Sequence, residues 1–86
     1  MDEIEELRKE IDLINQSILS ALNLRQMNVI KILRLKHAKG RPLRDPEREE
    51  QMLNKVTLTN TGPISSETVR DVFRAIFKHT VDDIKL

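Results

Sequence analysis

Apolar residues recur every three or four positions along the first 33 residues of the chain. They fall at Ile4, Leu7, Ile11, Ile14, Ile18, Ala21, Leu22, Val29, Ile32 and Leu33, and no glycine or proline interrupts the run before Gly40. This spacing places them along one face of an α-helix. The pattern predicts one long amphipathic helix that starts near Asp2 and ends at Gly40.

Two shorter helices are predicted after Gly40. Asp45 is a favourable N-cap and Pro46 suits the first helical position, so we expect a helix from Pro46 to about Thr59. A turn over residues 59–63 follows, and Ser65 or Ser66 then caps a third helix. The buried positions expected on these two helices are Met52, Leu53, Val56, Val69, Val72, Phe73, Ile76, Phe77, Val81 and Ile84.

No segment carries a strand signal, so the predicted fold class is all-α: one long and two shorter helices in one domain, residues 1–86. The long helix would span about 55 Å, whereas a compact globule of this size is only about 30 Å across. Its projecting apolar face must be covered, and a second copy in a symmetric homodimer covers it. An extended coiled coil is the less favoured alternative, because the two short helices also need packing partners.

The composition excludes several classes of function. The formal net charge is only +1 although 34% of the residues are charged, and the only aromatic residues are two phenylalanines, so we expect no nucleic-acid partner. There is no cysteine, and His37 and His79 lie far apart, so no metal or cofactor is expected. No apolar run has transmembrane length and no signal peptide is visible, which predicts a cytoplasmic protein without a membrane partner.

Two cations lie on or beside the apolar face of the long helix. Arg25 comes four residues before Val29, and Lys36 comes four residues after Ile32. They are eleven residues apart, so they point within about 20° of each other at a separation of about 16 Å. Such a pair can bind one small anion, or the two side chains can cover apolar surface while their charged ends reach water.

Arg8 is seventeen residues before Arg25, which corresponds to about 25 Å along the helix. It therefore cannot share a ligand with Arg25 of its own chain. In an antiparallel pairing of two long helices, Arg8 of one copy would approach the Arg25 region of the other. Otherwise it is an ordinary surface arginine.

The segment GRPLRDPEREE, residues 40–50, places a cation where a helix disfavours one. Arg48 lies in the first turn of the second helix, and its charge opposes the helix dipole unless an anion compensates it. Glu49 or Glu50 is one candidate anion, and a bound ligand is the other.

The ordered set of these residues resembles the all-helical class of chorismate mutases. The resemblance covers roughly residues 4 to 82 and rests on Leu7-Arg8, Ile11-Asp12, Asn15, Arg25, Lys36, the segment from Arg44 to Glu49, Gly62-Pro63 and the segment from Phe73 to Phe77. The segments EEQML and GP…FRAIFK look most like the mutase domain at the N-terminus of some bacterial first enzymes of the shikimate pathway. A fused or associated synthase is therefore a possible partner.

The resemblance implies an isomerase that rearranges chorismate to prephenate without a cofactor. It also implies an intertwined homodimer with two active sites, each built from both chains. By position, Arg8 of the partner subunit and Arg25 would bind the carboxylates of the substrate. Lys36 would bridge a carboxylate and the ether oxygen.

The remaining site residues follow from the same resemblance. Asp45 and Glu49 would hold the ring hydroxyl, and Arg48 would add positive charge beside the substrate. Thr80 stands where the family often has a serine near a carboxylate. Ile84 stands where the family usually has a glutamine or glutamate that donates to the ether oxygen, so either the last turn has a different register or one donor is missing.

Two other functions remain compatible with the sequence. One is a weakly active or inactive mutase-like domain that binds chorismate or prephenate and regulates a synthase. The other is a structural helical dimer whose cationic side chains bind no ligand and only extend into water.

Overall fold

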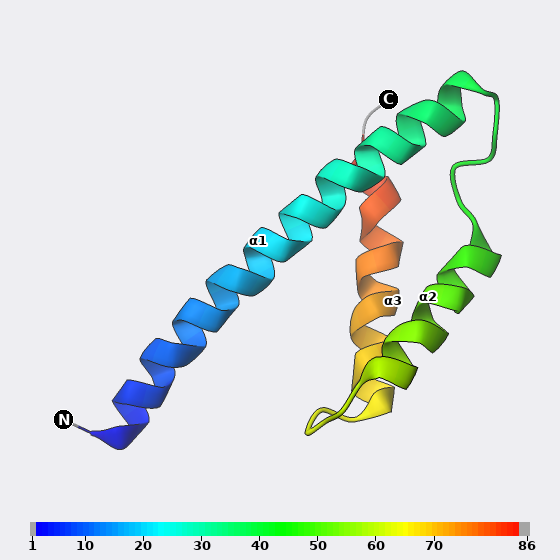
Figure 1. Ribbon diagram of the computed structural model, residues 1–86. Helices are drawn as coiled ribbons and strands as arrows, with labels where there is room; N and C mark the ends of the chain where they lie inside the picture. Colours follow the sequence, from blue (N-terminus) through cyan, green and yellow to red (C-terminus); the bar gives the residue numbers. More distant parts are fainter. Residues whose placement is uncertain (1, 85–86) are drawn as a thin grey trace. The chain divides into compact units, whose positions relative to one another are not determined.

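A computed structural model of the chain describes residues 2–84, which form three α-helices (Figure 1). These are α1 (Glu3–Ala38), α2 (Pro46–Thr59) and α3 (Ser66–Asp82). Residues 2–84 contain no β-strand, so the predicted all-α class is confirmed. The chain divides into two compact units, residues 1–32 and residues 33–86, and the last turn of α1 belongs to the second unit together with α2 and α3.

α1 ends at Ala38, two residues before the predicted end, and Gly40 closes its C-terminal cap. Gly40 has φ +65°, a left-handed conformation that glycine adopts without steric cost. The amide of Arg41 donates to the Lys36 carbonyl at 2.8 Å, and the amide of Gly40 donates to the His37 carbonyl at 3.1 Å. These two bonds form the Schellman arrangement that closes many helices, and they satisfy carbonyls at the end of the 36-residue helix.

The caps of α2 and α3 are also as predicted. Asp45 Oδ1 accepts from the Arg48 amide at 3.0 Å, and Pro46 occupies the start of α2. Ser65 is the cap of α3, since its Oγ accepts from the Thr68 amide at 3.1 Å. Both helix starts are therefore set by local sequence.

α2 and α3 pack side by side in the second unit (Figure 1). The best-buried apolar residues of this unit are Leu33, Leu53, Val69 and Phe77. Arg70 of α3 also reaches α2, where it donates to Glu50 at 2.9 Å and to Asn54 at 3.3 Å. The unit is thus held by a small apolar core and by polar contacts between the two helices.

The buried face of α3 differs from the predicted one at two positions. Val72 was expected to be buried but is 48% exposed, whereas Thr80, which was not expected in the core, is only 7% exposed. Val72 lies about 80° around the helix from Thr80, at the edge of the buried arc. The burial of Thr80 at the centre of that arc was not predicted, because a hydroxyl group is usually found at the surface.

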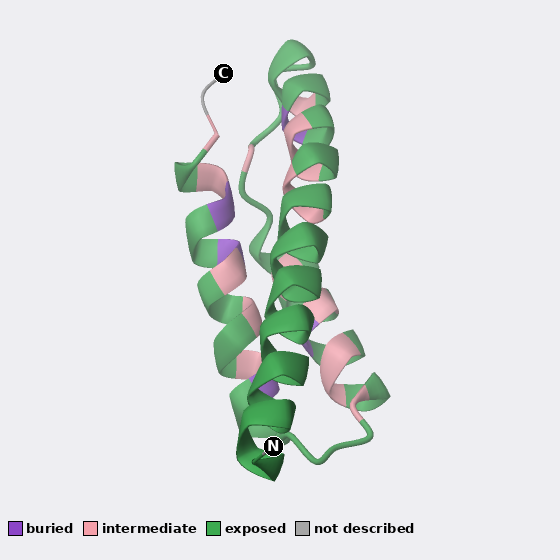
Figure 2. Ribbon diagram, turned by 90° about the vertical axis from the view of Figure 1, so that its left-hand side faces the viewer, coloured by how far each residue is buried: buried purple, intermediate pink, exposed green. Residues whose placement is uncertain are grey.

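In the first unit, α1 has an exposed apolar face. Every residue from 2 to 24 is exposed, and the helix is green throughout this part (Figure 2). Ile4, Leu7, Ile11, Ile14 and Ile18 are each between 52% and 58% exposed. None of the helices described is long and apolar enough for a membrane crossing.

Candidate active site

Most of the predicted site residues belong to the second unit. These are Lys36, Asp45, Arg48, Glu49, Thr80 and Ile84, contributed by the end of α1, the start of α2 and the end of α3. Arg8 and Arg25 belong to the first unit.

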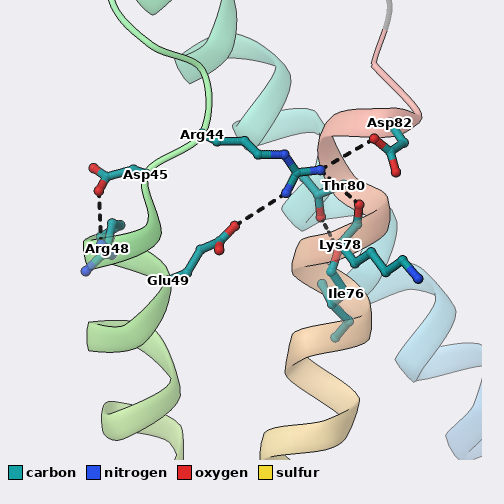
Figure 3. A network of polar contacts seen from close by, with 8 residues as sticks. All are labelled: Arg44, Asp45, Arg48, Glu49, Ile76, Lys78, Thr80 and Asp82. Carbon is teal, nitrogen blue, oxygen red and sulfur yellow. Dashed lines mark hydrogen bonds and ion pairs between the residues drawn. The ribbon is translucent and has the colours of Figure 1, made fainter.

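Arg44, in the loop between α1 and α2, joins the start of α2 to the last turn of α3 (Figure 3). Its Nη2 lies 3.3 Å from the carbonyl oxygen of Lys78 and 3.4 Å from Asp82 Oδ1. Its Nη1 lies 3.8 Å from Glu49 Oε1. The sequence pattern assigned Arg44 no role of its own, because its contacts with α3 join residues 34 and 38 positions apart.

Arg48 has no carboxylate partner in the part of the chain that the structure describes. The two neighbouring acids that could compensate it are engaged elsewhere: Glu49 with Arg44 at 3.8 Å and Glu50 with Arg70 at 2.9 Å. The side chain of Arg48 is exposed, in the first turn of α2. Compensation by Glu49 or Glu50 therefore does not explain this cation, and no carboxylate of the described chain forms an ion pair with it.

Two of the three carboxylates at the start of α2 are predicted site residues, whereas the third, Glu47, is not. Asp45 uses Oδ1 to cap α2, and Glu49 is half-buried beside Arg44. An ionised carboxylate offers about four lone-pair sites on its two oxygens. Both groups can therefore accept a hydrogen bond from a ligand hydroxyl without losing their present contacts.

Lys36 is a half-buried cation at the carboxyl end of α1. The negative end of the helix dipole stabilises a positive charge there. No ion pair within residues 2–84 involves Lys36. Like Arg48, it presents a positive charge that is not neutralised by a carboxylate of the described chain.

Thr80 and Ile84 lie at and beyond the end of α3. The Thr80 hydroxyl donates to the Ile76 carbonyl at 2.6 Å (Figure 3), a bond within the helix, so its proposed contact with a carboxylate stays a prediction. Ile84 lies two residues past the last residue of α3 and is partly buried. Its amide donates to the Val81 carbonyl at 3.2 Å. The expected continuation of the helical face to Ile84 is therefore wrong, because the helix has already ended.

The two arginines of the first unit differ in their surroundings. Arg8 pairs with Glu5 at 2.8 Å, and both side chains are more than half exposed. Arg25 is half-buried, and this burial lowers the pKa of its guanidinium from the ordinary value. Partial desolvation also strengthens the attraction of such a cation for an anion.

Comparison with known families identifies a match over most of the chain. Residues 7–83 match the family described as chorismate mutase type II. The range includes the candidate residues from Arg8 to Thr80, and Ile84 lies just past it. A bifunctional chorismate mutase/prephenate dehydratase from Aquifex aeolicus is 35% identical over 80 residues, which cover 88% of this chain and 22% of that protein. The chain thus spans about a fifth of the length of this curated relative.

Two solved structures have the same fold and a related sequence. Form I of chorismate mutase from Thermus thermophilus is 44% identical with a TM-score of 0.90, and the match covers 92% of this chain and 99% of that chain. Form II is also 44% identical, with a TM-score of 0.93 and a coverage of 95% of this chain and 93% of that chain. Likeness in both fold and sequence therefore extends over nearly the whole chain.

Proposed function

The chain belongs to the chorismate mutase type II family, and we propose that it rearranges chorismate to prephenate in a homodimer with two shared active sites. The observation that carries this function is the 44% identity to the Thermus thermophilus mutase, with a TM-score of 0.90 and a coverage of 99% of that chain. The all-helical family resemblance in the sequence leads to the same reaction.

The reaction requires little chemistry from side chains. It breaks one carbon–oxygen bond of the ether and forms one carbon–carbon bond within the same molecule. No nucleophile, acid–base pair or external electron acceptor takes part in the bond changes. The enzyme accelerates it by holding the dianionic substrate in a compact conformer and by placing positive donors where charge builds on the ether oxygen.

Three of the four proposed cations bind the carboxylates and the ether oxygen. Arg25 and Arg8 of the partner subunit hold the carboxylates, where a planar guanidinium donates two parallel hydrogen bonds. Lys36 bridges a carboxylate and the ether oxygen. Its lack of a carboxylate partner in the described chain supports this role, because the charge is not already neutralised.

The ring hydroxyl is held at the start of α2. Asp45 and Glu49 accept from it, while Arg48 adds positive charge beside the substrate. Thr80 lies near a carboxylate and Ile84 near the ether oxygen, where the family usually has a second donor. If Ile84 takes that place, Lys36 is the principal donor to the ether oxygen.

The distribution of charge along the chain supports an antiparallel pairing of the α1 helices. Residues 2–12 hold six carboxylates and two cations, a net charge of −4, whereas residues 13–44 hold seven lysines and arginines and no carboxylate. Antiparallel pairing sets the acidic end of one helix near the basic end of the other, and parallel pairing would align like charges. It also covers the exposed apolar face of α1 and brings Arg8 toward the partner's Arg25.

The activity is tested by following the loss of chorismate absorbance in the presence of the purified chain. Turnover supports the mutase. If there is no turnover but prephenate raises the melting temperature, the chain is a regulatory domain, since a ligand that binds only the folded state must stabilise it. If the chain shows neither turnover nor stabilisation by prephenate, the remaining function is that of a structural dimer. Sedimentation should give about twice the 10.0 kDa chain mass.

Two further expectations concern the context of the domain. The Aquifex aeolicus relative is described as bifunctional, which is compatible with a fused or associated partner enzyme here, and the sequence favours a shikimate-pathway synthase. Copurification or a rate change on adding such a synthase would support this. A cytoplasmic location also remains a prediction.

A further inference from the structure

Arg44 contacts three residues on two helices of the second unit. Nη2 donates to the Lys78 carbonyl and to Asp82 of α3, at 3.3 and 3.4 Å, while Nη1 faces Glu49 of α2 at 3.8 Å (Figure 3). The side chain itself comes from the loop that precedes α2. Its two terminal nitrogens therefore face different helices, and the α3 contacts hold the guanidinium in place opposite Glu49.

Glu49 has little else to fix its direction. An acidic side chain can bond back to the start of its helix from the third helical position, but in α2 that position is Arg48. Glu49 is one residue later, and no hydrogen bond of its carboxylate is found within residues 2–84. Its one charged contact in the described chain is Arg44.

We propose that Arg44 is a positioning residue, which aims the Glu49 carboxylate at the ring hydroxyl of the substrate. This inference rests on the proposed function. Loss of the contact would let Glu49 sample other rotamers, so that binding of the ring would include the cost of ordering it again.

A purely structural role explains the contact less well. The Arg44 side chain is 46% exposed, Glu49 is 31% exposed and Asp82 is 63% exposed. Ion pairs with this much solvent access add little to stability, because water and salt screen them. Orienting a carboxylate does not need a strong interaction, and the α3 contacts give the charge that faces Glu49 a defined position.

The arginine side chain suits this role better than lysine. A guanidinium presents donors in a fixed plane, so one nitrogen can face α3 while the other faces Glu49. A lysine ammonium has its three donors on one nitrogen, so it lacks the two separated nitrogens that face α3 and Glu49. Arg44→Lys should therefore restore only part of what Arg44→Gln loses.

The test is a double-mutant cycle on the full chain, with Arg44→Gln, Glu49→Gln and the double variant. We expect Arg44→Gln to lower kcat/KM by about tenfold, mainly through KM, because the hydroxyl is bound before and during the reaction. In the Glu49→Gln background the same change should have an effect of less than about twofold. The melting temperature should shift little, since water reaches both side chains of the pair and screens it.

Arg74→Gln is the matched control. Arg74 is also an exposed arginine with a carboxylate at 3.8 Å, in this case Asp71 of the same helix, and it has no place in the proposed site. Its loss should leave kcat/KM unchanged within about twofold. If Arg44→Gln does not fold, Arg44→Lys replaces it in the same double-mutant cycle.

The outcomes separate this inference from the proposed function. Turnover by the wild type and its loss in Glu49→Gln test the mutase assignment without reference to Arg44. Given those results, an unchanged kcat/KM in Arg44→Gln overturns the positioning role alone. An equal loss from Arg44→Gln in the wild-type and Glu49→Gln backgrounds also overturns it, because Arg44 would then act independently of Glu49.

Discussion

Replacing Arg48 should make the free protein more stable and the enzyme worse. The structure leaves this cation in the first turn of α2 while Glu49 and Glu50, the two acids expected to compensate it, are paired with other arginines, at 3.8 Å and at 2.9 Å. A charge of the wrong sign at a helix start costs about 0.3 to 1 kcal/mol. Nothing in residues 2–84 offsets it with an ion pair. Arg48→Ala should therefore raise the free energy of unfolding by about this amount.

The expected shift is measurable. For a domain of this size, roughly 0.5 kcal/mol changes the melting temperature by about 2 to 4 °C. The comparison must be made at one protein concentration, because the stability of a dimer depends on it. Lys55→Ala is the control in the same helix, away from the first turn, and should give no stabilisation. Added salt should reduce the gain from Arg48→Ala, since the dipole effect is screened.

The same variant should lose activity. Removing a preorganised positive group near the developing charge typically lowers kcat by about a hundredfold. Prephenate should also stabilise Arg48→Ala less than it stabilises the wild type. The difference between their melting temperatures should therefore become smaller or change sign when prephenate is added. A variant that is less stable than the wild type without ligand, or one with full turnover, would refute the view that Arg48 is retained for an anionic ligand.

Three more variants test the remaining site residues. Lys36→Ala should reduce kcat more than it raises KM, because charge on the ether oxygen grows only toward the transition state; similar changes in both constants would contradict this. In Arg25→Lys, the loss of activity with rising pH should begin at a lower pH than in the wild type. The burial that lowers the pKa of Arg25 also disfavours a lysine cation, and the lysine loses its charge above its pKa. A pH profile that coincides with that of the wild type would argue against a charge requirement at this position. Ile84→Gln should raise kcat by up to about a hundredfold over Ile84→Met, which has similar length but no amide donor, and equal rates in the two would remove the missing-donor explanation.

The fold was predictable because its signals are local. Asp45, Pro46, Ser65 and Gly40 set the helix ends through side-chain caps and a left-handed glycine, and each was readable in the sequence. Burial was less predictable, because it depends on which arc of a helix meets a neighbour. Val72 and Thr80 show this, since their apolar and polar character gave the opposite expectation.

The candidate site was readable as residue types but not as pairs. The sequence placed Arg48 close to Glu49 and Glu50. It could not show that these acids pair with Arg44 and Arg70, because those contacts join residues 5 and 20 positions apart. The role of Arg44 depends on the packing of the loop against α3, which no local spacing encodes. The early end of α3 before Ile84 is a further example, since apolar spacing alone predicted a longer helix.

Mixing two inactive variants tests the shared active site most directly. Arg8→Ala and Arg25→Ala homodimers should each be nearly inactive, because every site then lacks one carboxylate ligand. After subunit exchange, each heterodimer has one intact site, formed by Arg25 of the first chain and Arg8 of the second. With random pairing of equal amounts, half of the dimers are mixed, so activity should recover to about a quarter of the wild-type value. No recovery after exchange has been verified would contradict a site built from both chains.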